Sequence, residues 1–190
     1  MTPHLRLTNV MRMETPDEDL ARAAAFGDGD AFGALLARHY DRLFRLAFSL
    51  TGRRAEAEDL TQDICAALPA KLAGFRGQSR FTTWLYRVTV NAAHDRRRRA
   101  ATHMKAASGW GDWEIDRQAA MTEEAAAQGW LLQAMAALPP DLRDTVALTL
   151  GEEMSQAEAA QVLGISEGTV AWRMSEVKKK LRAMAVAEDR

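Results

Sequence analysis

Hydrophobic positions recur at helical spacing along most of the chain. Apolar side chains between Phe32 and Leu50 fall at steps of three and four residues, which places them on one face of a helix. The same spacing predicts further helices from about 55 to 68 and from about 80 to 99. No stretch alternates apolar and polar residues as a half-buried strand does, and we therefore predict an all-α protein.

The region from 153 to 182 predicts two short helices joined by a glycine-containing turn. Ser155 and Glu158 have the spacing of a capping box, in which each side chain satisfies the other's exposed backbone N–H. Gly164 can take the left-handed conformation that ends a helix, and Ser166 can cap the next one. This pattern is typical of a helix-turn-helix that reads DNA, and a solvated helical hairpin is the alternative.

The second helix of this pair has two different sides. Its apolar positions recur at steps of four, three and four residues, at Val170, Met174, Val177 and Leu181. The other side mixes small, aromatic and charged residues that could contact base edges or phosphates: Ala171, Trp172, Arg173, Ser175, Glu176, Lys178, Lys179 and Arg182.

Charge is segregated along the chain. The 190 residues carry a formal net charge of -1, which is unusual for a protein that binds nucleic acid. Acidic residues gather before residue 31 and between 112 and 124, whereas basic residues gather at 96–99 and 178–182. Two positive patches therefore persist within a nearly neutral chain. Some of the arginines at 96–99 are expected to lie near a helix C-terminus, where their charge interacts favourably with the helix dipole.

Several classes of protein are disfavoured by composition. With one cysteine, Cys65, the chain has no intramolecular disulfide and fits a reducing compartment; we expect this thiol to be buried rather than reactive. The four histidines lack metal-ligand spacing, and we find no nucleophile–base pair or phosphate-cradling loop. We expect no enzyme activity, metal or cofactor. No signal peptide or membrane span is evident, which predicts a cytoplasmic protein without membrane insertion.

Three segments together resemble the extracytoplasmic-function (ECF) sigma factors of bacterial RNA polymerase. They are AEDLTQD at 57–63, FRGQSRFTTWLYRVTVN at 75–91, and LPPDLR at 138–143 followed by the helix-turn-helix. The resemblance implies two small helical domains, sigma region 2 at 25–99 and sigma region 4 at 128–187. Weak periodicity outside them predicts a loosely ordered acidic tail at 1–24 and a flexible linker at 100–127. In that linker, Trp110 and Trp113 either dock on a neighbouring domain or enter a channel of a partner.

The resemblance assigns roles to three groups of residues. Asp59, Gln62 and Asp63 would bind core RNA polymerase, since carboxylates and an amide at this spacing form one acidic patch suited to arginines. The minus-ten element would be read by Lys71, Arg76, Gln78, Arg80, Arg87, Asn91 and Arg98, while Trp84 is expected in the core. The minus-thirty-five element would be read by Ala171, Trp172, Ser175 and Glu176, with phosphate contacts from Arg173, Lys178 and Lys179.

The function that the resemblance implies is promoter-specific transcription initiation. The partners would be core RNA polymerase, promoter DNA and an anti-sigma protein, in a stress response. Two alternatives remain open at this point: a sigma-like decoy that only binds an anti-sigma protein, and an autonomous helix-turn-helix repressor. The basic residues at Arg80 and Arg87 argue against the decoy, and the acidic face around Asp59 argues against the repressor.

Overall fold

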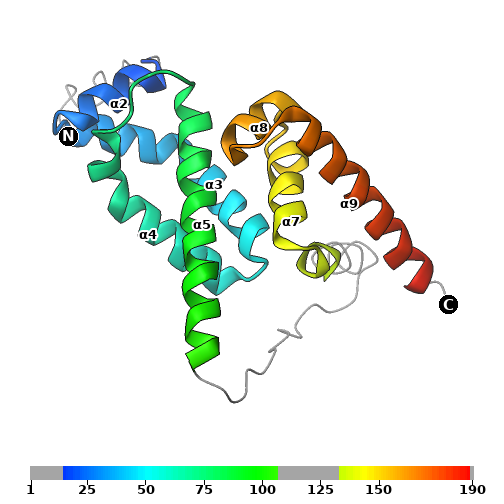
Figure 1. Ribbon diagram of the computed structural model, residues 1–190. Coiled ribbons are helices and arrows are strands. Elements are labelled where there is room, and N and C mark those ends of the chain that lie inside the picture. Colours follow the sequence, from blue (N-terminus) through cyan, green and yellow to red (C-terminus); the bar gives the residue numbers. More distant parts are fainter. Residues whose placement is uncertain (1–14, 107–132, 189–190) are drawn as a thin grey trace, which may run out of the picture.

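The structure is a computed structural model that describes residues 15–106 and 133–188, and all of its regular elements are helical (Figure 1). The N-terminal unit consists of α2 (Asp17–Ala25), α3 (Gly29–Thr51), α4 (Arg54–Leu72) and α5 (Phe81–Ala106). The C-terminal unit begins with helical residues 133–137 and continues with α7 (Pro140–Val146), a π-helical turn η1 (Ala147–Gly151), α8 (Gln156–Leu163) and α9 (Glu167–Glu188). The predicted all-α class and two-domain architecture are confirmed.

The long apolar stripe predicted from the sequence forms α3, the central helix of the N-terminal unit. Asp28 caps its start by accepting hydrogen bonds from the backbone N–H groups of Asp30 and Ala31, at 3.0 and 2.9 Å. Gly52 ends it in the left-handed conformation, with φ of 73°. The stripe between them is buried against α2, α4 and α5.

The expected tail at 1–24 ends earlier than predicted. Residues 1–14 lie outside the described part of the chain, but Asp17–Ala25 form α2, in which Leu20 and Ala21 are buried. Asp17 anchors this helix to α3 through Arg38 at 2.7 Å and His39 at 2.8 Å. These contacts join positions more than twenty residues apart. Because a short helix is stabilised mainly by such distant contacts, the pattern of its own residues gives little sign of it.

Two other boundaries differ from the sequence prediction. The α4 helix was predicted to end at about residue 68, but it passes through Pro69 and ends at Leu72, because buried Leu68 and Leu72 hold the last turn in the core. The α5 helix runs to Ala106, so that the first residues of the expected linker are helical and the basic run 96–99 lies inside the helix. The rest of the linker, with Trp110 and Trp113, lies outside the described residues.

The helix-turn-helix forms as its local pattern predicts. Ser155 and Glu158 make the complete capping box, and Gly164 ends α8 with φ of 67°. Ser166 accepts from the backbone N–H of Thr169 at 3.1 Å and so caps α9. Leu150, which precedes the helix-turn-helix, is a large apolar residue that is nevertheless 66% exposed. It lies in the π-helical turn, whose wider winding rotates Leu150 outward while Ala147 and Leu148 face the core.

Candidate functional site

The three candidate polymerase-binding residues lie together on the exposed side of α4. Asp59, Gln62 and Asp63 all face solvent, and the carboxylates are 64% and 73% exposed. The opposite side of the helix is buried, which fixes the direction in which the acidic side points. Arg96 of α5 lies against the pair, donating to Asp59 Oδ2 at 2.8 Å and to Asp63 Oδ2 at 3.1 Å. One guanidinium thus partly neutralises this acidic face.

The candidate minus-ten residues are all exposed, and they fall into two sets. One set shares a stripe that begins directly before α5 and continues along it, at spacings of seven, four and seven residues: Arg80, Arg87, Asn91 and Arg98. Arg76 and Gln78 lie in the loop that precedes α5, whereas Lys71 belongs to the last turn of α4.

An aromatic cluster holds this loop against α5. Phe75 lies 5.3 Å from Trp84 and 5.8 Å from Phe81, measured between ring centroids. Trp84 is half-buried and packs against the core, which agrees with the prediction that it is a core residue. Such offset and edge contacts stiffen the segment that presents Arg76 and Gln78.

The recognition helix α9 presents most of its candidate residues to solvent. Buried Val170 and Val177 fix its orientation in the C-terminal unit. The exposed residues are Ala171, Trp172, Ser175, Lys178 and Lys179, and Trp172 is 59% exposed. Glu176 is half-buried and bonded to Lys179 Nζ at 2.6 Å.

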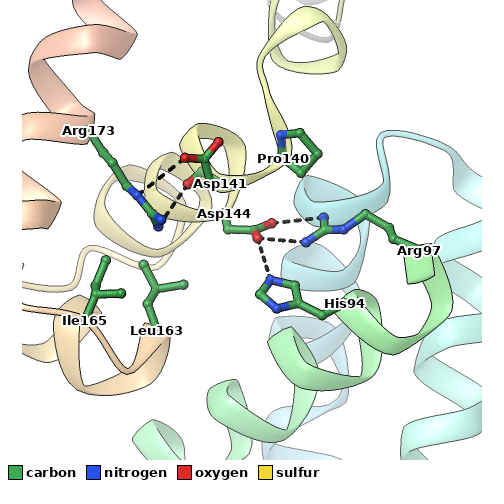
Figure 2. A pocket seen from close by; sticks show the side chains of 8 residues that line it. All are labelled: His94, Arg97, Pro140, Asp141, Asp144, Leu163, Ile165 and Arg173. Carbon is green, nitrogen blue, oxygen red and sulfur yellow. Dashed lines mark hydrogen bonds and ion pairs between the residues drawn. The ribbon is translucent and has the colours of Figure 1, made fainter. Parts of the chain in front are cut away.

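Arg173 has a different environment from the rest of the α9 set. Its side chain is only 18% exposed and its Nε lies 3.6 Å from Asp141 Oδ2 on α7 (Figure 2). In the observed conformation Arg173 therefore links α9 to α7 instead of presenting its head group to solvent.

Sequence reasoning missed a buried carboxylate between the two units. Asp144 of α7 is 2% exposed, and Arg97 of α5 donates to both of its oxygens, at 3.1 and 2.7 Å (Figure 2). His94 Nε2 lies 2.7 Å from Asp144 Oδ2. These groups line a cavity of about 280 Å³ between the units. Because Asp144 and Arg97 are 47 positions apart, local periodicity gives no sign of their contact.

A second buried carboxylate, Glu152, also contacts the N-terminal unit. The hydroxyl of Tyr86 donates to Glu152 Oε2, and Arg42 Nε lies 3.2 Å from the same oxygen. Burial, followed by the hydrogen bond and negative charge of Glu152, raises the pKa of Tyr86 well above its usual range. Tyr86 therefore remains a hydrogen-bond donor throughout the physiological pH range.

Three further observations concern metal binding, membrane spanning and the thiol of Cys65. Within residues 15–106 and 133–188, no cluster of three or more His, Cys, Asp or Glu side chains could hold a metal ion. None of the described helices is both long and apolar enough to span a membrane. Cys65 is half-buried, and burial raises the pKa of its thiol, which disfavours the reactive thiolate.

Comparisons with known proteins identify the family of the chain. The sequence model of Sigma-70 region 2 matches residues 35–102, and that of Sigma-70 region 4 matches residues 128–181. The chain is 35% identical to the ECF RNA polymerase sigma factor SigM of Mycobacterium tuberculosis, with 90% of this chain and 85% of the relative covered. It is 32% identical to the RNA polymerase sigma factor CnrH of Cupriavidus metallidurans, with 94% and 98% covered.

Solved structures agree with the sequence comparisons. The structure of CnrH in complex with the cytosolic domain of CnrY matches at a TM-score of 0.67 and 32% identity, covering 90% of this chain and 97% of that one. The sigma factor RpoE from Bartonella quintana, in complex with the anti-sigma factor NepR, shares the fold at a TM-score of 0.70 and 23% identity, covering 84% and 98%. The chain therefore belongs to the extracytoplasmic-function family of sigma factors, which are transcription initiation factors that bind core RNA polymerase and promoter DNA.

Proposed function

We propose that this protein directs core RNA polymerase to specific promoters through minus-ten and minus-thirty-five elements and assists promoter melting. The observation that carries the proposal is the match of both DNA-reading regions of the family in one chain, at 35–102 and 128–181. Exposure of the candidate residues on α5 and α9 supports it, because residues that contact DNA must reach the surface.

Each surface has chemistry suited to its proposed ligand. The carboxylates of Asp59 and Asp63 suit a basic surface of the polymerase. Arginines on α5 suit the phosphates of a melted strand, which dominate affinity for nucleic acid. On α9, exposed Trp172 and Ser175 suit base edges in the major groove, and Lys178 suits phosphate.

Anti-sigma control in a stress response is the finer part of the proposal. Its support is the relative CnrH, whose solved structure contains the cytosolic domain of CnrY. The likeness to CnrH covers 90% of this chain at a TM-score of 0.67, and it supports the proposal that a partner of that kind binds this protein.

Run-off transcription with purified core polymerase and a promoter library tests the proposed function. We expect transcripts that depend on this protein and that are lost with Asp59→Arg combined with Asp63→Arg. A decoy would give no transcripts. A repressor would bind duplex DNA tightly and specifically without polymerase, as seen in a gel shift at physiological salt, and either result would overturn the proposal.

A further inference from the structure

The loop that carries the proposed minus-ten residues Arg76 and Gln78 ends where α5 begins, at Phe81. A residue of α2 holds this point, because Glu18 Oε1 accepts a hydrogen bond from the backbone N–H of Phe81 at 3.0 Å. We propose that Glu18 is a positioning residue for minus-ten recognition, which caps α5 and thereby fixes the loop. The ligand of the loop rests on the proposed function; the capping of α5 by Glu18 does not.

The residue at the N-cap of α5 cannot cap the helix with its own side chain. Arg80 occupies this position, because its carbonyl accepts the first bond of the helix, from the N–H of Trp84 at 3.1 Å. A guanidinium has donors only and cannot accept from the N–H groups of a first turn. The helix dipole also favours a negative group at this end. Glu18 supplies both features, an acceptor oxygen and a negative charge.

A cap from α2 leaves position 80 available for a basic residue. Arg80 is exposed and begins the stripe of proposed DNA contacts along α5. A serine, threonine or aspartate at this position would cap the helix, but it would not bind a phosphate as an arginine does. Because Glu18 provides the cap from 63 positions away, the chain combines a capped helix end with an arginine at that end.

Helix α2 is fixed on the core of the N-terminal unit. Asp17, the residue before Glu18, lies 2.7 Å from Arg38 Nη1 and 2.8 Å from His39 Nε2, both on α3. Leu20, in the next turn of α2, is buried. Figure 1 shows α2 at the same end of the N-terminal unit as the start of α5. The position of the Glu18 carboxylate is therefore set by α3 and the core, and not by the loop.

The ring of Phe81 extends the constraint into the loop. It is 1% exposed and contacts Phe75 of the loop at 5.8 Å and Trp84 of α5 at 5.7 Å, measured between ring centroids. The ring of His39 on α3 lies 5.3 Å away. Because both the backbone N–H and the ring of Phe81 are held, Phe75 packs on a fixed surface, and the adjacent Arg76 extends from a defined point.

The middle of the loop has little local reason to keep one shape. Gly77 has a φ of 66°, and glycine adopts many other conformations as readily. Its neighbours Arg76 and Gln78 are exposed, so that burial of their side chains does not fix the loop. The shape is therefore decided at the two ends, by the last turn of α4 and by the capped start of α5. A loop that is ordered in advance loses less entropy when it binds a base.

Glu18→Ala in the full chain tests this role. The substitution removes the acceptor from Phe81 and leaves every proposed DNA contact in place. The amide of Phe81 should exchange with deuterium about fivefold faster, as for the loss of one helix cap, which NMR measures. In run-off transcription, the preference for the best minus-ten sequence over its variants should fall by up to about fivefold, while the ranking of minus-thirty-five variants should not change.

Two conservative variants separate the hydrogen bond of Glu18 from its charge. Glu18→Gln loses the charge but keeps an oxygen that can accept from Phe81, so that it should retain most of the parent's behaviour in both measurements. Glu18→Asp keeps the charge but is one methylene shorter, so that it should resemble Glu18→Ala. Circular dichroism and thermal denaturation verify that each variant keeps its helices.

Asp19→Ala is the matched control. Asp19 follows Glu18 in the same first turn of α2, but it is exposed and pairs with Arg22 at 2.8 Å. Asp19→Ala and Glu18→Ala make the same change of charge, so that the difference between them isolates the contact with Phe81. The control should change neither the exchange of the Phe81 amide nor the minus-ten ranking.

The outcomes separate this inference from the proposed function. Unchanged exchange of the Phe81 amide in folded Glu18→Ala would overturn the capping of α5, whatever transcription shows. Faster exchange with an unchanged minus-ten ranking would overturn the positioning role, while transcripts from the parent still support the proposed function. A parent without transcripts would contradict the proposed function and, with it, the ligand of the loop. Faster exchange and a flatter minus-ten ranking, both reversed in Glu18→Gln, are the results that we expect.

Discussion

Arg96 and Arg97 are neighbours on α5, yet they hold carboxylates in opposite surroundings. Arg96 contacts Asp59 and Asp63, which are 64% and 73% exposed. Arg97 contacts Asp144, which is 2% exposed. Exposed ion pairs contribute little to stability because water and salt screen them, whereas a buried charge depends on its partner. The first pair can therefore exchange partners readily, and the second fixes the arrangement of the two units.

Reversing the exposed acids should have the largest effect on partner binding and little effect on the fold. In Asp59→Arg with Asp63→Arg, like charges would face the proposed basic surface of the polymerase, at a cost of several kcal/mol, or about 100-fold or more in affinity. The unfolding free energy should change by no more than about 0.5 kcal/mol per site, since both residues are on the surface.

Affinity for core polymerase is measured by titration, and stability by chemical denaturation. Glu56→Arg with Glu58→Arg is the control, because these residues lie in the same helix and pair with Arg53 and Arg54 instead of Arg96. If the control loses as much affinity as the test variant, the effect reflects overall charge and the assignment of Asp59 and Asp63 is wrong.

Glu176 extends the comparison to a carboxylate of intermediate burial. It is bonded to Lys179 on the recognition helix, and it is a proposed reader of base edges together with exposed Ser175. Glu176→Ala or Ser175→Ala should change the ranking of minus-thirty-five variants by about 1 to 2 kcal/mol per contacted base pair. The measurement is run-off transcription from a library of such variants.

Lys178→Ala is the matched control on the same helix. Loss of the Lys178 ammonium group should reduce transcription from all promoters about equally and lower its sensitivity to salt, because phosphates carry no sequence information. An unchanged ranking with both Glu176→Ala and Ser175→Ala would show that these positions do not read bases.

Local patterns in the sequence were enough to predict the helices and their caps. Ser155, Glu158 and Gly164 form the predicted helix boundaries because their interactions span no more than four residues. Helix α2 and the exposure of Leu150 were not predicted, since the first depends on contacts with α3 and the second on one π-helical turn. Tertiary packing decides both.

The candidate site shows the same division between local and distant information. Helical spacing correctly indicated that Asp59 of α4 and Trp172 of α9 face solvent. It did not indicate that Arg173 pairs with Asp141, or that Arg97 pairs with Asp144, because these partners lie 32 or more positions apart. The ion pair between Arg97 and Asp144, which joins the two units, could be found only from the three-dimensional structure.

Glu158 is a further carboxylate to compare with Asp59 and Asp144, because it is exposed yet held by local hydrogen bonds. Bonds from the backbone and hydroxyl of Ser155 lower the pKa of this carboxyl below its usual value of 4.5. Since the folded-state pKa is lowered, its contribution to stability is complete above that usual value and is lost as the pH falls through the folded-state pKa. Ser155→Ala should cost about 1 kcal/mol at neutral pH.

Denaturation of the parent and of Ser155→Ala across the acid range tests this prediction. The difference between the two proteins should shrink as Glu158 becomes protonated, because the bonds to its carboxylate are then lost in the parent also. Ser175→Ala serves as the control, since Ser175 is exposed and caps no helix. A difference that stays constant with pH would mean that the capping box contributes no pH dependence.

The smallest expected effect is the change in affinity for core polymerase when Arg96 is replaced. Because its guanidinium neutralises Asp59 and Asp63 in the free protein, a basic surface of the polymerase must displace it or share the carboxylates with it. An exposed pair is worth about 0.2–1 kcal/mol, so that Arg96→Ala should tighten core binding by no more than about fivefold. Titrations at low and high salt measure the effect, which should fade at high salt as the charges are screened.

Arg99→Ala, which removes an equal charge from the same helix, provides the baseline for a general change in net charge. If Arg96→Ala weakens core binding relative to that baseline, Arg96 holds the carboxylates in a productive orientation, and the view of it as a competitor for the acidic face is wrong.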